Sequence, residues 1–157
     1  MSRRRQATKR AVLPDARFES TLVTRLISTV MKSGKKSTAE RIVYGAFDEI
    51  ASRNPQSNPL EILQRAVDNA KPRIETKPRR VGGATYQVPL EVTLDRQFSL
   101  ALRWLVGLAD ARKGLPMKNA LASEIMDAYQ GQGGAIRKRD EVHRMAQANK
   151  AFAHFRW

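Results

Sequence analysis

A short segment near the middle of the chain concentrates positive charge. Residues 71–80 contain one acidic and five basic side chains, and the basic ones are Lys71, Arg73, Lys77, Arg79 and Arg80. Guanidinium groups can fork onto phosphate oxygens or stack on unpaired bases. Alternatively, such charges only protect exposed strand edges from aggregation, but edge protection does not require this density of cations. The segment therefore favours contact with a nucleic acid.

Two other segments hold most of the remaining positive charge. Residues 1–17 carry six basic side chains and one acidic side chain, net +5, and residues 137–157 carry six and two, net +4. Together with residues 71–80, also net +4, they hold thirteen of the fourteen net positive charges. Solubility alone needs a net charge of only about 2–8 on a small domain. We therefore predict a near-neutral scaffold with separate cationic elements that contact a polyanion.

Several basic residues outside residues 71–80 are further candidate RNA contacts. An extended N-terminal arm over residues 1–18 can follow phosphates, although it can also be a disordered tail. The arm, two helix–helix connections and a basic last helix contribute Arg3, Arg4, Arg5, Lys9, Arg10, Lys35, Lys36, Arg112, Lys113, Lys118, Arg137, Lys138, Arg139 and Arg144. The sequence has none of the common DNA-binding motifs. Basic elements dispersed in this way suit a folded RNA, which presents phosphates from many directions.

The sequence lacks the residue patterns that enzymes and metal sites need. Gly34-Lys35-Lys36-Ser37 superficially matches a phosphate-binding loop, but Thr29 occupies the position of the first glycine and Lys36 that of the Ser/Thr. The chain has no cysteine, and its two histidines alone do not make a zinc site. No apolar run approaches the roughly 20 residues of a membrane span. We expect no enzymatic activity, no cofactor, no metal and no membrane association.

Apolar periodicity predicts a mainly α-helical single domain of six helices with one protruding β-hairpin. Helices are expected over about 20–32, from a Ser37–Glu40 capping box to Arg53, from the N-cap Asn58 to Lys71, over about 94–110, from Met117 to Gly131, and over about 134–149. Gly34 should end the first helix in a left-handed conformation. The domain divides into the arm 1–18, helices in 19–72 and 93–149, the hairpin 73–91 and a tail 150–157.

The predicted hairpin rests on a change of period. Residues 73–92 alternate between apolar and polar side chains, and Gly82-Gly83 lies midway, where a tight turn can accept positive φ angles. Pro78 and Pro89 cannot donate to a central ladder, so both strands must be edges. A two-stranded ribbon alone is marginal in water. Its stem should therefore lean on helices while its tip projects.

The C-terminal part of the chain has too little apolar surface for a core element. The last helix combines basic residues with a thin apolar face of Val142, Met145 and Ala146, so it should lie along a partner. The tail contains Phe152 and Phe155 near cations. These rings could stack on bases, insert into a neighbouring protein or fold back onto the bundle, and the sequence leaves the three alternatives open.

Several motifs, in order along the chain, resemble the bacterial-type ribosomal protein seven family of the small subunit. The hairpin motif runs from Lys77 to Glu91 as KPRRVGGATYQVPLE, and residues 135–156 form an equally specific C-terminal motif. Residues 34–39, Arg103-Trp104-Leu105 and the Ser2-Arg-Arg-Arg start agree as well. The resemblance covers essentially the whole chain.

This resemblance implies a structural, primary rRNA-binding protein. Members of the family bind the 3′ major domain of 16S-type rRNA and nucleate assembly of the subunit head, at the subunit interface near the decoding region. Expected neighbours are exit-site tRNA, messenger RNA and small-subunit proteins nine and eleven, in the cytoplasm or in an organelle. The tRNA-proximal residues would be Arg79, Arg80, Gly82, Gly83, Thr85 and Arg144. A free-standing nucleic-acid chaperone or DNA compactor is the competing hypothesis.

Overall fold

The computed structural model describes residues 10–155. Its elements, in order, are α1 (Thr21–Val30), α2 (Lys36–Arg53), α3 (Pro59–Ala70), β1 (Ile74–Val81), β2 (Ala84–Glu91), α4 (Leu94–Asp110), α5 (Met117–Tyr129), α6 (Gly133–Ala148) and a 3₁₀ helix η1 (Lys150–Phe155). The predicted mainly helical fold with one hairpin is confirmed, and η1 is an additional element. The candidate contacts Arg3, Arg4, Arg5 and Lys9 lie outside the described residues.

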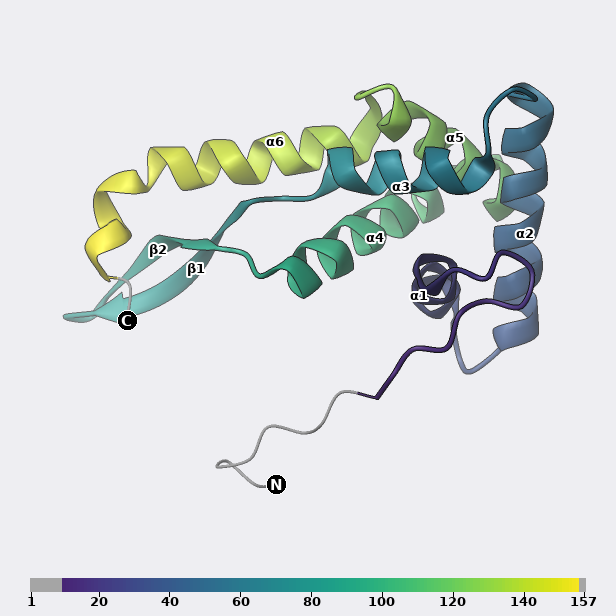
Figure 1. Ribbon diagram of the computed structural model, residues 1–157. Coiled ribbons are helices and arrows are strands. Elements are labelled where there is room, and N and C mark those ends of the chain that lie inside the picture. The colour runs from purple at the N-terminus through teal and green to yellow at the C-terminus, as the bar shows by residue number, and fades with distance from the viewer. Residues whose placement is uncertain (1–9, 156–157) are drawn as a thin grey trace.

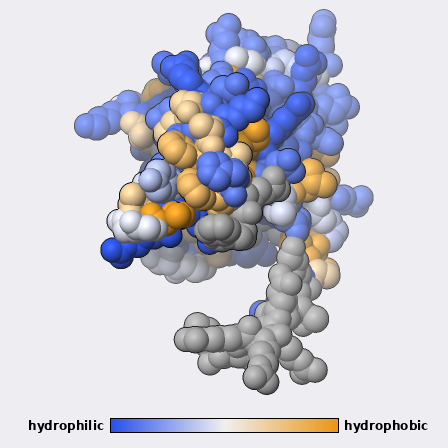
Figure 2. All heavy atoms as spheres, turned by 90° about the vertical axis from the view of Figure 1, so that its left-hand side faces the viewer, coloured by the Kyte–Doolittle hydropathy of each residue, from blue (hydrophilic) through white to orange (hydrophobic). Residues whose placement is uncertain are grey.

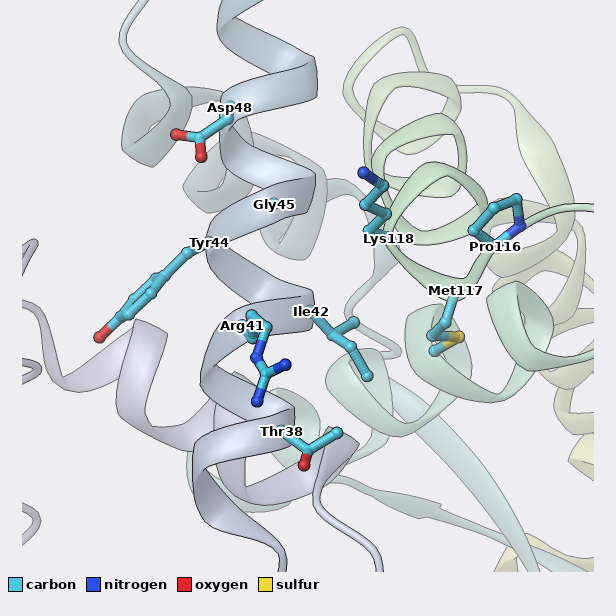
Figure 3. A pocket seen from close by; sticks show the side chains of 9 residues that line it. All are labelled: Thr38, Arg41, Ile42, Tyr44, Gly45, Asp48, Pro116, Met117 and Lys118. Atoms are coloured by element: carbon cyan, nitrogen blue, oxygen red, sulfur yellow. The ribbon is translucent and has the colours of Figure 1, made fainter.

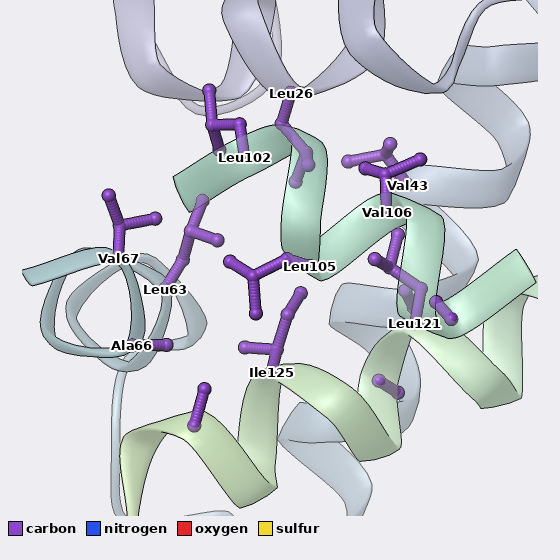
Figure 4. Packing of buried hydrophobic residues seen from close by; sticks show 14 of the residues in the cluster. Leu26, Val43, Leu63, Ala66, Val67, Leu102, Leu105, Val106, Leu121 and Ile125 are labelled. Atoms are coloured by element: carbon purple, nitrogen blue, oxygen red, sulfur yellow. The ribbon is translucent and has the colours of Figure 1, made fainter. Parts of the chain in front are cut away.

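Helices α1 to α5 form the body of the molecule around one hydrophobic core (Figure 4). Leu63 of α3, Leu105 of α4 and Ile125 of α5 are fully buried and converge at its centre. On α1, the predicted stripe of Val23, Leu26, Ile27 and Val30 is buried throughout. Helical spacing of three and four residues places such side chains on one face, and burying that face stabilises short helices.

The helix boundaries confirm one predicted cap and correct two others. The Asn58 side chain accepts a hydrogen bond from the Leu60 N–H at 3.0 Å, with Pro59 in the first helical position. The Ser37–Glu40 capping box is wrong, because α2 already begins at Lys36 and Ser37 lies inside its first turn. Gly34 has the expected positive φ of 73°, but it shapes the turn into α2, since α1 ends earlier, at Val30.

The hairpin is antiparallel and closes through a two-residue turn. Val81 pairs with Ala84, and the intervening Gly82 and Gly83 have φ angles of +57° and +88°. Positive φ at both turn residues is the geometry that suits the right-handed twist of the strands. Among residues 10–155 each strand has only one neighbour, so the ladder accommodates Pro78 and Pro89.

The hairpin, α6 and η1 together extend away from the body, and we call these elements the projection (Figure 1). Helix α6 packs along both strands, and η1 packs against β2. The ring of Tyr86 lies 5.0 Å from that of Phe152 and 5.3 Å from that of Phe155. Of the three alternatives for the tail, the described residues 150–155 therefore fold back onto their own chain, on the hairpin rather than on the bundle. As predicted, helices support the hairpin stem.

Candidate nucleic-acid interface

The strand register distributes the hairpin cations over both faces of the ribbon. Lys77 pairs with Val88, and Arg79 pairs with Tyr86. Opposite residues in an antiparallel pair share a face. Val88 is buried and Tyr86 packs against η1, so their face of the ribbon is the one that the helices support. The side chains of Lys77 and Arg79 lie on this supported face. The exposed Arg80 lies on the opposite face. The cations therefore flank the ribbon instead of forming one row.

One glutamate organises the charges at the stem. Glu75 lies 3.5 Å from the Lys77 Nζ and accepts hydrogen bonds from the Arg96 Nε at 2.8 and 2.9 Å. The hydrogen bond to Glu75, together with its negative charge, raises the pKa of Arg96. Arg96 thus ties the start of α4 to β1. Lys77 keeps an exposed ammonium group beside this pair.

The two cations at the root of the hairpin differ in their surroundings. Lys71 lies 2.6 Å from the Asp68 carboxylate and 3.4 Å from the centroid of the Phe98 ring, and its side chain is only 17% exposed. Lys71 therefore belongs to the scaffold. Arg73 donates its backbone N–H to the His143 Nε2 at 3.0 Å, and Arg73 itself remains exposed. Burial, followed by the charge of Arg139, lowers the pKa of His143, which favours the neutral acceptor form.

Arg112 has a structural role that the sequence analysis did not predict. Its guanidinium contacts the Asp127 carboxylate at 2.6 Å and also donates to Glu124, which is buried. Hydrogen bonds to both carboxylates raise the pKa of Arg112. Arg112 therefore links α4 to α5 through its Nε and Nη2 groups, and with 30% of its side chain exposed it stays a predicted RNA contact.

The other predicted cations lie at the surface, in two groups. Surface ion pairs engage Lys36 with Glu40, Lys138 with Glu141, and Arg139 with Asp140. Exposed pairs such as the first two contribute little free energy. Arg139 differs, because its side chain is only 28% exposed and it also donates to the Asn69 carbonyl. The exposed residues Arg10, Lys35, Lys113, Lys118, Arg137 and Arg144 form no ion pair within residues 10–155.

A basic groove on the body was missed by sequence reasoning. It has a volume of about 700 Å³ between α1, α4 and the segment before α1. Its lining includes one carboxylate, that of Asp95, and three guanidinium groups, those of Arg10, Arg25 and Arg103, with the hydroxyl-bearing Ser28, Thr29 and Ser99. The guanidinium groups are donors that bind phosphate oxygens, whereas the three hydroxyls donate to backbone carbonyls four residues earlier in their own helices. The available signal was the spacing of Arg25, Ser28 and Thr29 on the polar side of α1. Only the fold shows that this side faces α4.

The N-terminal arm is anchored to the body by a buried aspartate. Asp15 accepts the backbone N–H groups of Arg17 and Phe18 at 3.1 and 3.2 Å, and the hydroxyl of Tyr44 at 2.8 Å. The hydrogen bond from Tyr44 to Asp15 is the main reason that the pKa of Tyr44 is raised to about 12. Asp15 therefore joins the base of the arm to α2. From this anchor the chain runs back to Arg10 at the basic groove.

A second hollow, of about 580 Å³, lies between α2 and α5 (Figure 3). Lys118, a predicted RNA contact, lines it together with Thr38, Arg41, Ile42, Tyr44, Gly45, Asp48, Pro116 and Met117. A Cβ atom at position 45 would lie 3.3 Å from the Lys118 Cδ, so glycine there lets the two helices approach. This lining contains more carbon-rich side chains than the basic groove does.

Figure 2 looks onto the projection, where hydrophilic residues surround a smaller apolar patch. Residues 10–155 contain no cluster of three potential metal-ligating side chains, and none of their helices is long and apolar enough to cross a membrane. The strongest chemical feature of the described surface is thus its cations, which lie on the body groove and on the projection.

The chain is similar over its whole length to small-subunit ribosomal proteins. Residues 2–150 match the family described as ribosomal protein S7p/S5e. The small ribosomal subunit protein uS7 of Dictyoglomus turgidum is 59% identical over 157 residues, which cover 100% of both chains. The same protein of Akkermansia muciniphila is 57% identical over 100% of both chains, and that of Kosmotoga olearia is 55% identical over 99% of each.

Proposed function

Because this chain belongs to the ribosomal protein S7p/S5e family and is a structural, non-enzymatic protein of the small ribosomal subunit, we propose that it binds 16S-type rRNA directly. The observation that carries this proposal is the presence of available cations on two separate parts of the fold. Arg25 and Arg103 line the body groove, whereas Arg73 and Arg80 are exposed on the projection. Two such surfaces can hold RNA helices whose phosphates would otherwise repel each other.

The proposed binding site on the RNA is the 3′ major domain, and the proposed consequence is nucleation of the subunit head. Base edges are inaccessible in the deep major groove of A-form RNA, so recognition there depends on shape, phosphates and 2′-hydroxyl groups. A rigid protein with cations on several elements is suited to such recognition. Early binding would fix the relative positions of rRNA helices before other proteins join.

The hairpin tip is proposed to lie near exit-site tRNA and messenger RNA, at the subunit interface. Its support is the shape of the tip: Gly82 and Gly83 have no side chains, and Arg80 and the exposed Thr85 flank them. A narrow tip of this kind can approach a nucleic-acid backbone closely. Small-subunit proteins nine and eleven are the proposed protein neighbours, and the cytoplasmic small subunit is the proposed location.

Direct binding is tested with a transcript of the 3′ major domain. Arg25→Ala combined with Arg103→Ala should weaken binding and reduce the slope of log affinity against log salt by about two, because each lost phosphate contact removes about 0.9. The matched control removes the same charge from α2, with Arg41→Ala and Arg53→Ala. Equal slopes for the two double variants would contradict the groove assignment. Equal affinity of the parent protein for an unrelated RNA would instead favour a chaperone.

The exposed cations of the tip are tested by chemical footprinting of the same transcript. Arg80→Ala should expose one set of protected nucleotides, and a second set, which depends on Arg25 and Arg103, should stay protected. This result would support two separate contact surfaces. If all protected nucleotides lost protection to the same extent in Arg25→Ala, Arg103→Ala and Arg80→Ala, the body and the projection would not bind distinct parts of the RNA.

A further inference from the structure

A buried carboxylate lies where three helices meet. Glu124 of α5 is only 1% exposed, and with Asp15 it is one of the two buried charged residues in the described chain. One carboxylate oxygen accepts the Ala135 N–H, in the first turn of α6, at 2.9 Å. The other accepts from Arg112, just after α4. A buried charge is unfavourable unless it is fully paired, so this arrangement requires a reason.

The surrounding junction leaves little room for movement. A Cβ atom at Gly133 would lie 2.8 Å from the Asp127 Cβ, and one at Gly134 would lie 3.0 Å from the Leu108 Cδ1. Gly133 also has a φ of +92°, which strongly favours glycine. Arg112 spans the junction, because it contacts Asp127 as well as Glu124. The first turn of α6 is therefore held in one position against α4 and α5.

The direction of α6 at this junction determines where the projection lies. Helix α6 has 16 residues, a length of about 24 Å at 1.5 Å per residue. A change of about 10° at its first turn would displace its far end by about 4 Å. Along its length, Arg139 donates to the Asn69 carbonyl at 2.6 Å and His143 accepts from the Arg73 N–H. The direction of α6 at its first turn therefore determines the position of the hairpin that packs along it.

We propose that Glu124, held by Arg112, is a positioning residue that aligns the projection with the basic groove so that both surfaces bind one RNA simultaneously. The proposal rests on the proposed function, because its benefit is the gain in affinity from two linked contacts. Linked contacts strengthen binding only when the geometry allows both at once, and that gain disappears when one surface is misdirected. Glu124 itself is buried, so it acts through the helix and not by touching RNA.

The first test measures the geometry without RNA. The chain has no cysteine, so Ser52→Cys on α2 and Thr85→Cys at the tip provide two unique sites for spin labels. Glu124→Gln keeps an oxygen for the Ala135 N–H but turns amide donors toward Arg112. We expect a narrow distance distribution in the labelled parent and one that is broader or shifted by several ångström in Glu124→Gln. The control Glu61→Gln, an exposed carboxamide substitution on α3, should match the parent.

The second test measures binding to the 3′ major domain transcript. Glu124→Gln and Glu61→Gln each make the protein more positive by one charge, so electrostatics alone predicts equal or tighter binding for both. We expect Glu124→Gln to bind on the order of tenfold more weakly, as the loss of one of two linked contacts predicts. In a background of Arg79→Ala and Arg80→Ala, where the tip contact is already lost, Glu124→Gln should have little further effect.

The two tests separate this proposal from the proposed function. If the parent protein does not bind the transcript, the proposal of direct rRNA binding is wrong. The distance measurement then still decides the role of Glu124. If Glu124→Gln folds with native helix content and keeps the narrow distribution of the control, the positioning role is wrong. If Glu124→Gln does not fold, Arg112→Lys replaces it, because lysine keeps the charge but loses the two-pronged contact. A narrow parental distribution in Arg112→Lys would then overturn the proposal.

Discussion

The body and the projection are stabilised in different ways. In the body, apolar side chains from α1 to α5 bury one another in a continuous core, which Ala135 and Ile136 in the first turn of α6 complete. In the projection, Val88 of the hairpin and Ala146 of α6 are buried, and the aromatic contacts of Tyr86 and the Arg73–His143 hydrogen bond join its elements. A core of the first kind excludes unpaired charges, whereas a thin element leaves most of its side chains accessible. The body thus supplies most of the buried apolar surface, whereas exposed cations lie both on its groove and on the projection.

A matched pair of valine substitutions tests this comparison most strongly. Val67 in the body and Val88 in the projection are both fully buried. Val67→Ala should lower the free energy of unfolding by about 2 kcal/mol, because two carbons are lost and a cavity remains. Val88→Ala should lower it by clearly less, because the thin hairpin can close over the gap. Urea denaturation followed by circular dichroism measures both, and equal losses would contradict separate stabilisation.

The aromatic contacts provide a smaller, local effect. Tyr86→Leu keeps an apolar side chain but removes the ring interactions with Phe152 and Phe155, which we expect to contribute about 1 kcal/mol. Amide hydrogens of β1 and β2 should exchange faster, while those of α3 and α5 should keep their rates. Faster exchange throughout the molecule would mean that the projection and the body unfold as one unit.

In the body, alkaline pH should remove a specific contribution to stability. The folded pKa of Tyr44 is raised to about 12, above its ordinary value of 10.0, so folding favours the neutral phenol. The contribution is therefore complete below pH 10 and is lost as the pH rises from 10 toward 12. Tyr44→Phe should show a weaker decline of unfolding free energy over this range. An identical decline in both proteins would show that the Asp15–Tyr44 hydrogen bond is not responsible.

In the projection, the smallest effect is expected on the acid side. Burial lowers the folded pKa of His143 below its ordinary value of 6.5, and the neutral ring accepts the Arg73 N–H. The stability that this contributes is complete above pH 6.5 and is lost as the pH falls through the folded pKa. Hydrogen exchange at Arg73 should accelerate with acidification in the parent and be fast at every pH in His143→Ala, after correction for intrinsic exchange. A His143→Ala protein with the parental pH profile would exclude this role.

Local sequence patterns predicted the helices and the hairpin. They did not predict the basic groove or the contacts of Arg112, because these depend on residues far apart in the sequence. The spacing of Val23, Leu26 and Ile27 is visible in ten residues of sequence, and so is the Gly82-Gly83 turn. The groove needs Arg10, Arg25 and Arg103 to converge from three segments, which no local pattern encodes. Likewise, no local pattern pairs Arg112 with Glu124 and Asp127, because both carboxylates lie on the next helix, beyond a turn.

The tail illustrates the same limit. The spacing of Phe152 and Phe155 suits one face of a helical turn, but their partner Tyr86 lies more than 60 positions earlier in the sequence. The sequence therefore left three alternatives that only the packing of η1 on β2 distinguished for the described residues.

The hydrogen bond between Arg73 and His143 joins residues 70 positions apart, and this separation has a consequence for the order of folding. The hairpin closes through two residues, and isolated hairpins form in about 1–10 μs. Its support must wait until the intervening helices have brought α6 into place, because contacts between distant residues form slowly. We therefore expect the strands to pair early but to fluctuate, and the completed projection to be among the last parts of the molecule to become ordered.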